Sequence, residues 1–129
     1  MILMDTHIWL RWILPNEPLS DNHLKLINSS DSLAVSSISC WEIVLLEKWN
    51  KIELPLPINE WLNEALAGSS VTALPITASI AEYAGSLAYH HKDPADRFII
   101  ATACLHDIGL ISLDNQFSSY NELKNLLIS

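Results

Sequence analysis

Met1-Ile-Leu-Met-Asp5-Thr-His-Ile-Trp-Leu-Arg-Trp-Ile-Leu14 opens the chain with a short apolar run followed by a longer helical stretch. The apolar run predicts a buried strand over residues 1–4. The longer stretch predicts a helix over residues 6–14 that ends at Pro15, because proline lacks the amide proton that a continuing helix needs. The opening therefore predicts a strand and a helix joined at Asp5.

The same alternation continues along the chain. Further short apolar runs predict strands over residues 33–36, 71–74 and 110–112, with a further edge strand over 126–128. Helices are predicted over residues 21–29, 39–49, 58–67 (ended by Gly68), 78–90, 94–106 (stopped before Gly109) and 118–125, with an extended linker over 54–57. Strands that alternate with helices predict a parallel sheet covered on both faces. We expect an α/β fold, a three-layer α/β/α domain over residues 1–129 with a mainly parallel sheet of four or five strands.

Composition places the chain among ordinary globular proteins of the cytoplasm. Its 129 residues fit one domain, and a hydrophobic content of 50% supplies a core without disulfides. Cys40 and Cys104 form no C-x-x-C pair and suit reduced core positions. No apolar run approaches the ~20 residues of a membrane span. We therefore expect a cytoplasmic protein.

The charge balance weighs against a nucleic-acid partner. Seven Lys and Arg stand against 15 Asp and Glu, a formal net charge of −8. Proteins that bind nucleic acids normally carry a basic surface that neutralises phosphates. That objection weakens if several of the carboxylates surround bound divalent cations, because the cations reverse the local field.

Carboxylates stand at the ends of the predicted strands or at the start of the following helices. The set comprises Asp5, Glu42, Asp96 and Asp114, with Asp93 close by. Ligands of an open parallel sheet bind beyond the carboxyl ends of its strands, so we expect these acids at one sheet edge. Clustered carboxylates need a counter-charge, and only Lys92 and Arg97 adjoin them in sequence. Mg²⁺ or Mn²⁺ would supply that charge and activate water against a phosphodiester.

Each acid also has a structural interpretation. Asp5 and Asp93 are good helix N-caps, Ser39-x-x-Glu42 matches a capping box, Asp96 suits a helix dipole, and Asp114-Asn115 suits a turn. A non-catalytic acidic protein-binding module is therefore one alternative. A receiver-like phospho-acceptor domain is another, although no Lys comes directly after the predicted strand at residues 110–112. A zinc site that includes His7 is a third alternative, but no Cys or second His stands at ligand spacing.

Four motifs together resemble PIN-domain nucleases. They are Met4-Asp-Thr-His7, Val35-Ser-Ser-Ile-Ser-Cys-Trp-Glu-Ile43, Asp93-Pro-Ala-Asp-Arg-Phe-Ile-Ile-Ala-Thr-Ala103 and Leu110-Ile-Ser-Leu-Asp-Asn-Gln-Phe117. They occur in the family's order and cover nearly the whole chain. The small single-domain form is similar to the VapC-type toxins of type II toxin–antitoxin pairs. Ala95 departs from the bulkier residue usual there, which concerns packing more than chemistry.

The resemblance implies a Mg²⁺- or Mn²⁺-dependent endoribonuclease that forms a homodimer and is inhibited by a cognate antitoxin. It carries over Asp5, Glu42, Asp96 and Asp114 as the catalytic, metal-binding quartet. Thr6 would orient the first acid, Ser112 keeps a hydroxyl in the fourth motif, and Asp93 either assists or only caps its helix. Candidate phosphate contacts are Arg11, Lys48, Lys51 and Arg97. We expect the five Trp residues to serve core or dimer-interface packing.

Overall fold

Five parallel strands form the centre of the protein. The computed structural model describes residues 1–14, 16–88 and 93–129. The strands are β1 (Ile2–Met4), β2 (Leu33–Ser36), β3 (Val71–Leu74), β4 (Gly109–Ile111) and β5 (Leu127–Ile128), in the order β3-β2-β1-β4-β5. All neighbouring pairs are parallel, and β1 lies at the centre with Leu3 opposite Ala34 and Leu110. The predicted parallel sheet is confirmed.

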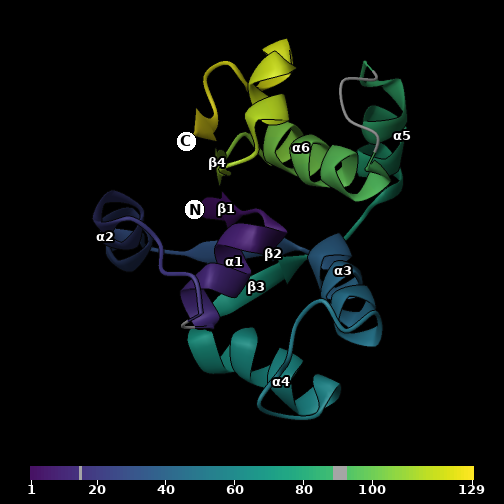
Figure 1. The fold of residues 1–129 in the computed structure, drawn as a ribbon. Helices are drawn as coiled ribbons and strands as arrows, with labels where there is room; N and C mark the ends of the chain where they lie inside the picture. Colours follow the sequence, from purple (N-terminus) through teal and green to yellow (C-terminus); the bar gives the residue numbers. More distant parts are fainter. Residues whose placement is uncertain (15, 89–92) are drawn as a thin grey trace.

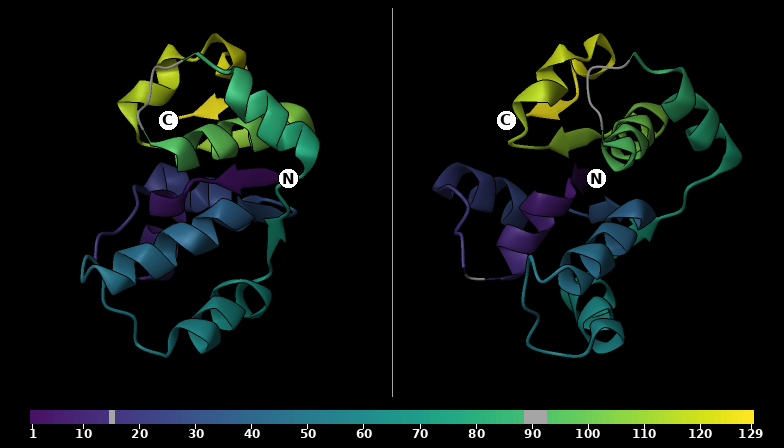
Figure 2. Two further views of the ribbon diagram at one scale, coloured as in Figure 1. Left: turned by 90° about the vertical axis from the view of Figure 1, so that its right-hand side faces the viewer. Right: turned by 45° about the vertical axis from the view of Figure 1, so that its right-hand side comes forward.

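Helices cover both faces of this sheet. They are α1 (Thr6–Ile13), α2 (Asp21–Ser29), α3 (Ser37–Lys48), α4 (Ile58–Ala65), α5 (Ala78–Ser86) and α6 (Pro94–His106), with 3-10 turns η1 (Ala67–Ser69), η2 (Asn115–Ser119) and η3 (Asn121–Leu123). Figures 1 and 2 show α5, α6 and the C-terminal turns on one side of β1, with α1 and α4 on the other. The layers are those of the predicted three-layer α/β/α fold.

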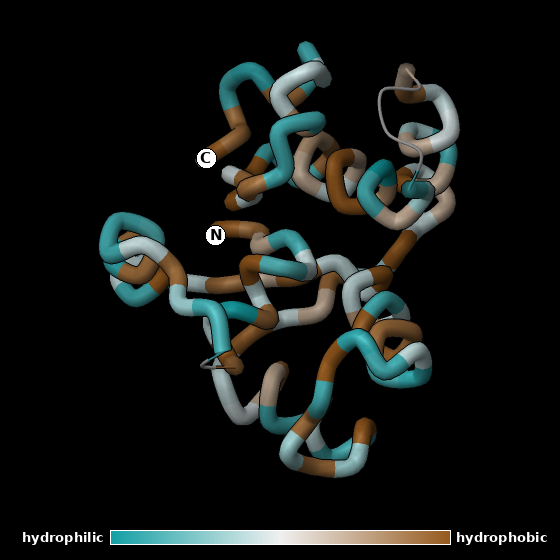
Figure 3. The backbone as a smooth tube through the Cα atoms, viewed as in Figure 1, coloured by the Kyte–Doolittle hydropathy of each residue, from teal (hydrophilic) through white to brown (hydrophobic). Residues whose placement is uncertain are grey.

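Alternating side chains of the strands supply two separate cores. In β1, Met4 packs with α1, α2 and α4, whereas Leu3 faces α6 and the C-terminal turns. In β4, Ile111 and Leu110 divide in the same way, because successive side chains of a strand point to opposite faces. The sheet is thus buried on both sides, and in Figure 3 the N-terminal strand is brown while the helices mix brown and teal.

A pair of tryptophans anchors α4 beneath α1. The rings of Trp9 and Trp61 lie 5.8 Å apart at 50°, and both side chains are buried. The indole nitrogen of Trp9 donates a 3.1 Å hydrogen bond to the carbonyl of Ala65. This packing holds α1, and with it the residue before α1, at the carboxyl end of β1.

Several predicted boundaries need correction. Helix α3 begins at Ser37 with Ser36 as its N-cap, not at residue 39. The predicted helix over residues 118–125 is wrong, since 3-10 turns occupy that region. Helix α5 ends at Ser86, with Leu87 as its C-cap, so the predicted helix end at residue 90 is wrong. The predicted stop at Pro15 lies outside the described residues, as do residues 89–92.

The predicted glycine stops are also wrong. Helix α4 ends at Ala65, before Gly68. Helix α6 ends at His106, as predicted, but the residue that terminates it is Asp107, which adopts the left-handed conformation (φ 53°) usual after a helix, and Gly109 is already the first residue of β4.

Across residues 1–14, 16–88 and 93–129, none of the helices combines the length and the apolar character needed to cross a bilayer.

Candidate active site

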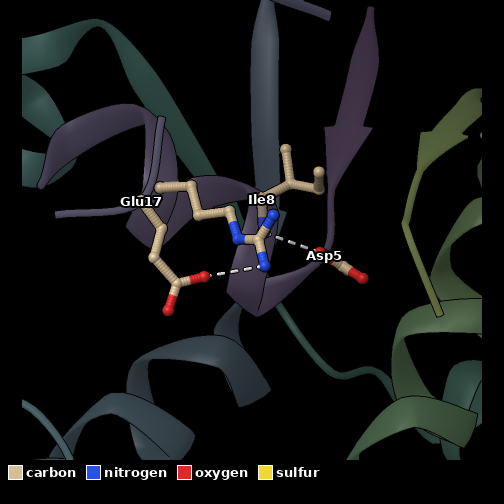
Figure 4. A network of polar contacts seen from close by, with 4 residues as sticks. Asp5, Ile8 and Glu17 are labelled. Carbon is tan, nitrogen blue, oxygen red and sulfur yellow. Dashed lines mark hydrogen bonds and ion pairs between the residues drawn. The ribbon is translucent and has the colours of Figure 1, made fainter. Parts of the chain in front are cut away.

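Asp5 lies where β1 ends and α1 begins. Its side chain is 5% exposed and caps α1, because Oδ1 accepts a 2.8 Å hydrogen bond from the amide of Ile8 (Figure 4). Its Oδ2 accepts a 2.6 Å hydrogen bond from the hydroxyl of Ser112. The cap predicted from sequence is therefore present, and it fixes the carboxylate at the edge of the central strand.

Ser112 joins the first acid to the last. This residue follows β4 directly, and its side-chain oxygen also accepts a 3.0 Å hydrogen bond from the amide of Asp114. Asp114 in turn caps η2 through the amide of Gln116. The parallel pairing of β1 with β4 brings Asp5 and Asp114 together although they are far apart in sequence.

Glu42 reaches the site from the second turn of α3. The predicted capping box is wrong, because Ser36 caps α3 and both Ser39 and Glu42 lie within the helix. Thr6 Oγ1 lies 2.5 Å from Glu42 Oε1 and 2.8 Å from Ser39 Oγ. Since a hydroxyl has one proton, we assign it to the Glu42 carboxylate, with Ser39 donating to Thr6. Thr6 thus ties α1 to α3.

The start of α6 brings two more acids to Glu42. Asp93 caps α6 through the amide of Ala95, with Pro94 at the first helical position. Carboxylate oxygens of Glu42, Asp93 and Asp96 lie within 4.8 Å of one another. Asp93 is therefore a helix cap and a member of the cluster at the same time, so the two roles that the sequence left open are compatible.

Two of the five acids, Asp5 and Glu42, have raised pKa values. Burial raises the pKa of Asp5, against the lowering effect of the Ser112 hydrogen bond, and Asp114 raises it further. Burial also raises the pKa of Glu42, the Thr6 hydrogen bond opposes this, and the charges of Asp93 and Asp5 add to the increase. Crowded carboxylates thus resist ionisation here, as expected when like charges share a partly dry site.

The donor set fits a hard divalent cation. Every candidate ligand in the cluster is a carboxylate oxygen, which Mg²⁺ and Mn²⁺ prefer and which Zn²⁺ sites seldom use alone. A cation would also relieve the repulsion that raises the pKa values of Asp5 and Glu42. The arrangement is therefore suited to holding a metal ion against a phosphate group.

The predicted cationic contacts divide into two groups. Arg97 Nη2 donates 3.2 Å hydrogen bonds to the carbonyls of Gly85 and Leu87, which ties the start of α6 to the end of α5. Arg11 and Lys51 line a groove that also contains His7. Sequence reasoning missed Ser39 as a partner of Thr6, and it missed His7 as a neighbour that lowers the pKa of Asp5 and Glu42.

The tryptophans are also divided. Trp9 and Trp61 belong to the core, as expected. Trp41 and Trp49 on and just after α3 are 52% and 58% exposed.

Fold and site together define an α/β protein with a carboxylate cluster at the carboxyl edge of a parallel sheet. The family model described as "PIN domain" matches residues 2–123, and the chain belongs to this family. It is 33% identical over 120 residues to Ribonuclease VapC22 of Mycobacterium tuberculosis, covering 92% of this chain and 91% of that protein.

Solved structures agree on the fold. A toxin-antitoxin complex from Klebsiella pneumoniae contains a chain with a TM-score of 0.69 and 21% identity, covering 100% of this chain and 97% of that one. VapBC2 from Rickettsia felis, bound to a DNA fragment from its promoter, gives a TM-score of 0.70 at 21% identity, covering 99% and 98%. The family match favours a PIN-domain protein over the receiver-like alternative.

Proposed function

We propose that this protein is a divalent-metal-dependent endoribonuclease, the toxin of a toxin–antitoxin pair. The observation that carries the proposal is the cluster of Glu42, Asp93 and Asp96, whose carboxylate oxygens lie within 4.8 Å of one another next to Asp5. Membership of the PIN domain family and the similarity to a ribonuclease support the choice of RNA as substrate. Mg²⁺ or Mn²⁺ is the proposed cofactor.

The metal would be held by Glu42 and Asp96, with Asp5 and Asp114 completing the quartet and Asp93 assisting. A bound divalent cation supplies positive charge that stabilises the phosphodiester during displacement and acidifies water. The protein keeps the acids in place. Thr6 holds Glu42, Ser112 holds Asp5, and Arg97 ties the helix that carries Asp96 to the carbonyls after α5.

Helix capping alone does not explain this arrangement. Asp5, Asp93 and Asp114 each cap a helix, as a non-catalytic module would require. Glu42 caps nothing in α3, yet it lies half-buried against Asp93 and Asp96. A half-buried acid among other acids destabilises the folded state by charge repulsion, and Glu42 has no capping role that would offset this cost. A bound cation would offset it, so the arrangement favours a metal site.

The proposal is tested by metal-dependent cleavage of RNA by the full chain. We expect cleavage with Mg²⁺ or Mn²⁺, none in EDTA, and a loss of at least about hundredfold in Asp96→Asn, because a charge that stabilises the reaction is removed. Asp31→Asn removes an exposed acid outside the cluster and serves as the matched control. Full activity of Asp96→Asn, or no Mn²⁺ binding by calorimetry, would leave the protein-binding alternative.

The proposed partners are an antitoxin and a second copy of this chain. Two structurally similar chains come from complexes of a toxin with an antitoxin or of VapBC2 with DNA. The exposed Trp41 and Trp49 leave apolar surface on α3 that a second copy would cover. A cytoplasmic location suits the free Cys40 and Cys104.

A further inference from the structure

A groove of about 590 Å³ runs along α1 and contains His7. One of its walls is a face of α1, on which His7, Leu10 and Arg11 recur at the spacing of helical neighbours, continued by the C-cap residue Leu14. The opposite wall is the segment after α3, residues 50–53. Asn16 and Glu17 complete its lining.

The groove approaches the candidate active site at His7. Asp5 caps α1, and His7 follows two residues later. The His7 imidazole lies near enough to both Asp5 and Glu42 to lower the pKa of each. With a rise of 1.5 Å per residue, the α1 face leads about 10 Å away from His7 to Leu14. A polymer bound at the acids can therefore extend away from them along this face of α1.

The groove holds two cations and two acids. Arg11 and Lys51 are two of the chain's seven Lys and Arg residues, and Glu17 and Glu53 line the same groove. Lys51 is placed by the end of α3, where Asn50 adopts a left-handed conformation (φ 57°). The amides of Asn50 and Lys51 bond to the carbonyls of Glu47 and Leu46, a Schellman motif that turns the chain into the groove.

One of these cations is paired with an acid that a stronger ligand can displace. Arg11 Nη2 lies 2.9 Å from Glu17 Oε2, with side chains 35% and 72% exposed (Figure 4). Exposed pairs of this kind contribute little to stability. A phosphate offers a guanidinium group a bidentate, charge-assisted contact. Glu17 is therefore suited to hold Arg11 in the groove until a phosphate replaces it.

We propose that this groove binds the backbone of single-stranded RNA next to the cleaved phosphodiester. Arg11 and Lys51 contact its phosphates, and Glu17 competes with the RNA for Arg11. The inference rests on the proposed endoribonuclease function and adds the path of the substrate. It assigns to Glu17 an inhibitory effect on RNA binding, which sets it apart from a residue that only stabilises the fold.

The test measures the binding of a short, labelled, mixed-sequence single-stranded RNA by fluorescence anisotropy, with Mg²⁺ present. All proteins are full chains that carry Asp96→Asn to prevent cleavage. We expect Arg11→Gln and Lys51→Gln each to weaken binding about tenfold, as for hydrogen bonds to charged groups. Each should lower the slope of log affinity against log salt by about 0.7. Arg11→Lys should retain most of the slope.

Glu17→Gln provides the sharper measurement. We expect it to tighten RNA binding by about two- to fivefold, because the competing carboxylate is removed. Glu82→Gln and Lys124→Gln make the same charge changes on α5 and beyond η3, outside the groove. They control for net charge and should leave affinity and slope unchanged relative to Asp96→Asn alone.

The outcomes separate this inference from the proposed function. Groove variants that match the controls, or Asp96→Asn protein that binds no RNA, would overturn the inference, and the groove would be left to a protein partner. RNA cleavage by the unsubstituted chain is scored independently. Cleavage without the groove pattern rejects only the RNA path, whereas the groove pattern without cleavage rejects only the nuclease.

Discussion

The two halves of the acid cluster differ in burial. Asp5 is 5% exposed, and both of its carboxylate oxygens accept hydrogen bonds, from Ile8 and Ser112. Glu42, Asp93 and Asp96 are only partly buried, and their oxygens face one another within 4.8 Å. The difference in burial indicates that the two halves have different roles. The buried half fixes the geometry at the end of β1, and the open half is accessible to a cation and to substrate.

Thr6 links the halves, and its loss should have the largest effect among the residues that hold the acids. It follows Asp5 directly and bonds to Glu42. We expect Thr6→Val, which keeps the shape but removes the hydroxyl, to reduce metal-dependent cleavage about 10- to 100-fold, the range typical of residues that orient metal ligands. Metal affinity by calorimetry should fall with it.

Thr72→Val is the matched control, because Thr72 is exposed on β3. Equal activities of the two Val variants would show that the Thr6 hydroxyl is not needed to hold Glu42 in place. Thr6 would then not connect the buried half of the cluster with the open half.

Ser112 tests the buried half by itself. Ser112→Ala removes the hydrogen bonds to Asp5 and to the amide of Asp114 at a residue that is 1% exposed. We expect the free energy of unfolding to fall by about 1–3 kcal/mol, because buried polar groups lose their partners. The pKa of Asp5 should rise further, since the Ser112 hydrogen bond lowers it.

Urea denaturation measures the loss, and Ser29→Ala, at an exposed position on α2, should change stability by less than about 0.5 kcal/mol. A Ser112→Ala variant as stable as this control would show that the buried half does not depend on its hydrogen bonds.

The open half of the cluster should make the stability of the protein depend on pH. We expect this to be the smallest of the predicted effects. Burial holds the pKa of Glu42 above its ordinary value of 4.5, so the folded chain binds more protons than the unfolded chain above that pH. Stability of the metal-free protein should therefore decrease as pH rises from 4.5 through the raised pKa. Glu42→Gln removes this group, and its stability should decrease less.

Urea unfolding in EDTA between about pH 5 and about pH 8 measures the difference. Mn²⁺ should stabilise the unsubstituted protein at the upper pH and have little effect on Glu42→Gln. Glu82→Gln, on α5, serves as the control. A steeper decrease in Glu42→Gln than in the unsubstituted chain would contradict the raised pKa.

Prediction from sequence succeeded where local signals agreed. The strands at 33–36 and 71–74 and the helices at 21–29 and 94–106 lie where the alternation predicted them. It failed where two local signals competed. Ser36 and Ser39 are both good N-caps, and the helix begins at the earlier one because β2 ends there and Ser39 is needed beside Thr6. No pattern in the sequence distinguishes the two serines.

The structure brings the predicted acids near one another, but the hydrogen bonds and close approaches that link them could not be predicted. In the sequence, the acids follow predicted strands or open predicted helices, and this predicts that they lie at one edge of a parallel sheet, although Glu42 lies in the second turn of α3. That Glu42 meets Asp93 and Asp96, while Asp5 meets Ser112, depends on how α3 and α6 pack across the strands. Such contacts join residues far apart in the chain, and side-chain identity alone does not encode their distances.

The sequence by itself determined the class of fold, through apolar runs alternating with helical stretches, and the set of acids, through their places in that alternation. Only the tertiary structure decided that one half of the cluster is buried and the other open. It alone paired Arg11 with Glu17 and placed His7, which lines the groove, near Asp5 and Glu42. The physical reason is that periodicity is a local property, whereas burial and charge pairing depend on which distant segments meet.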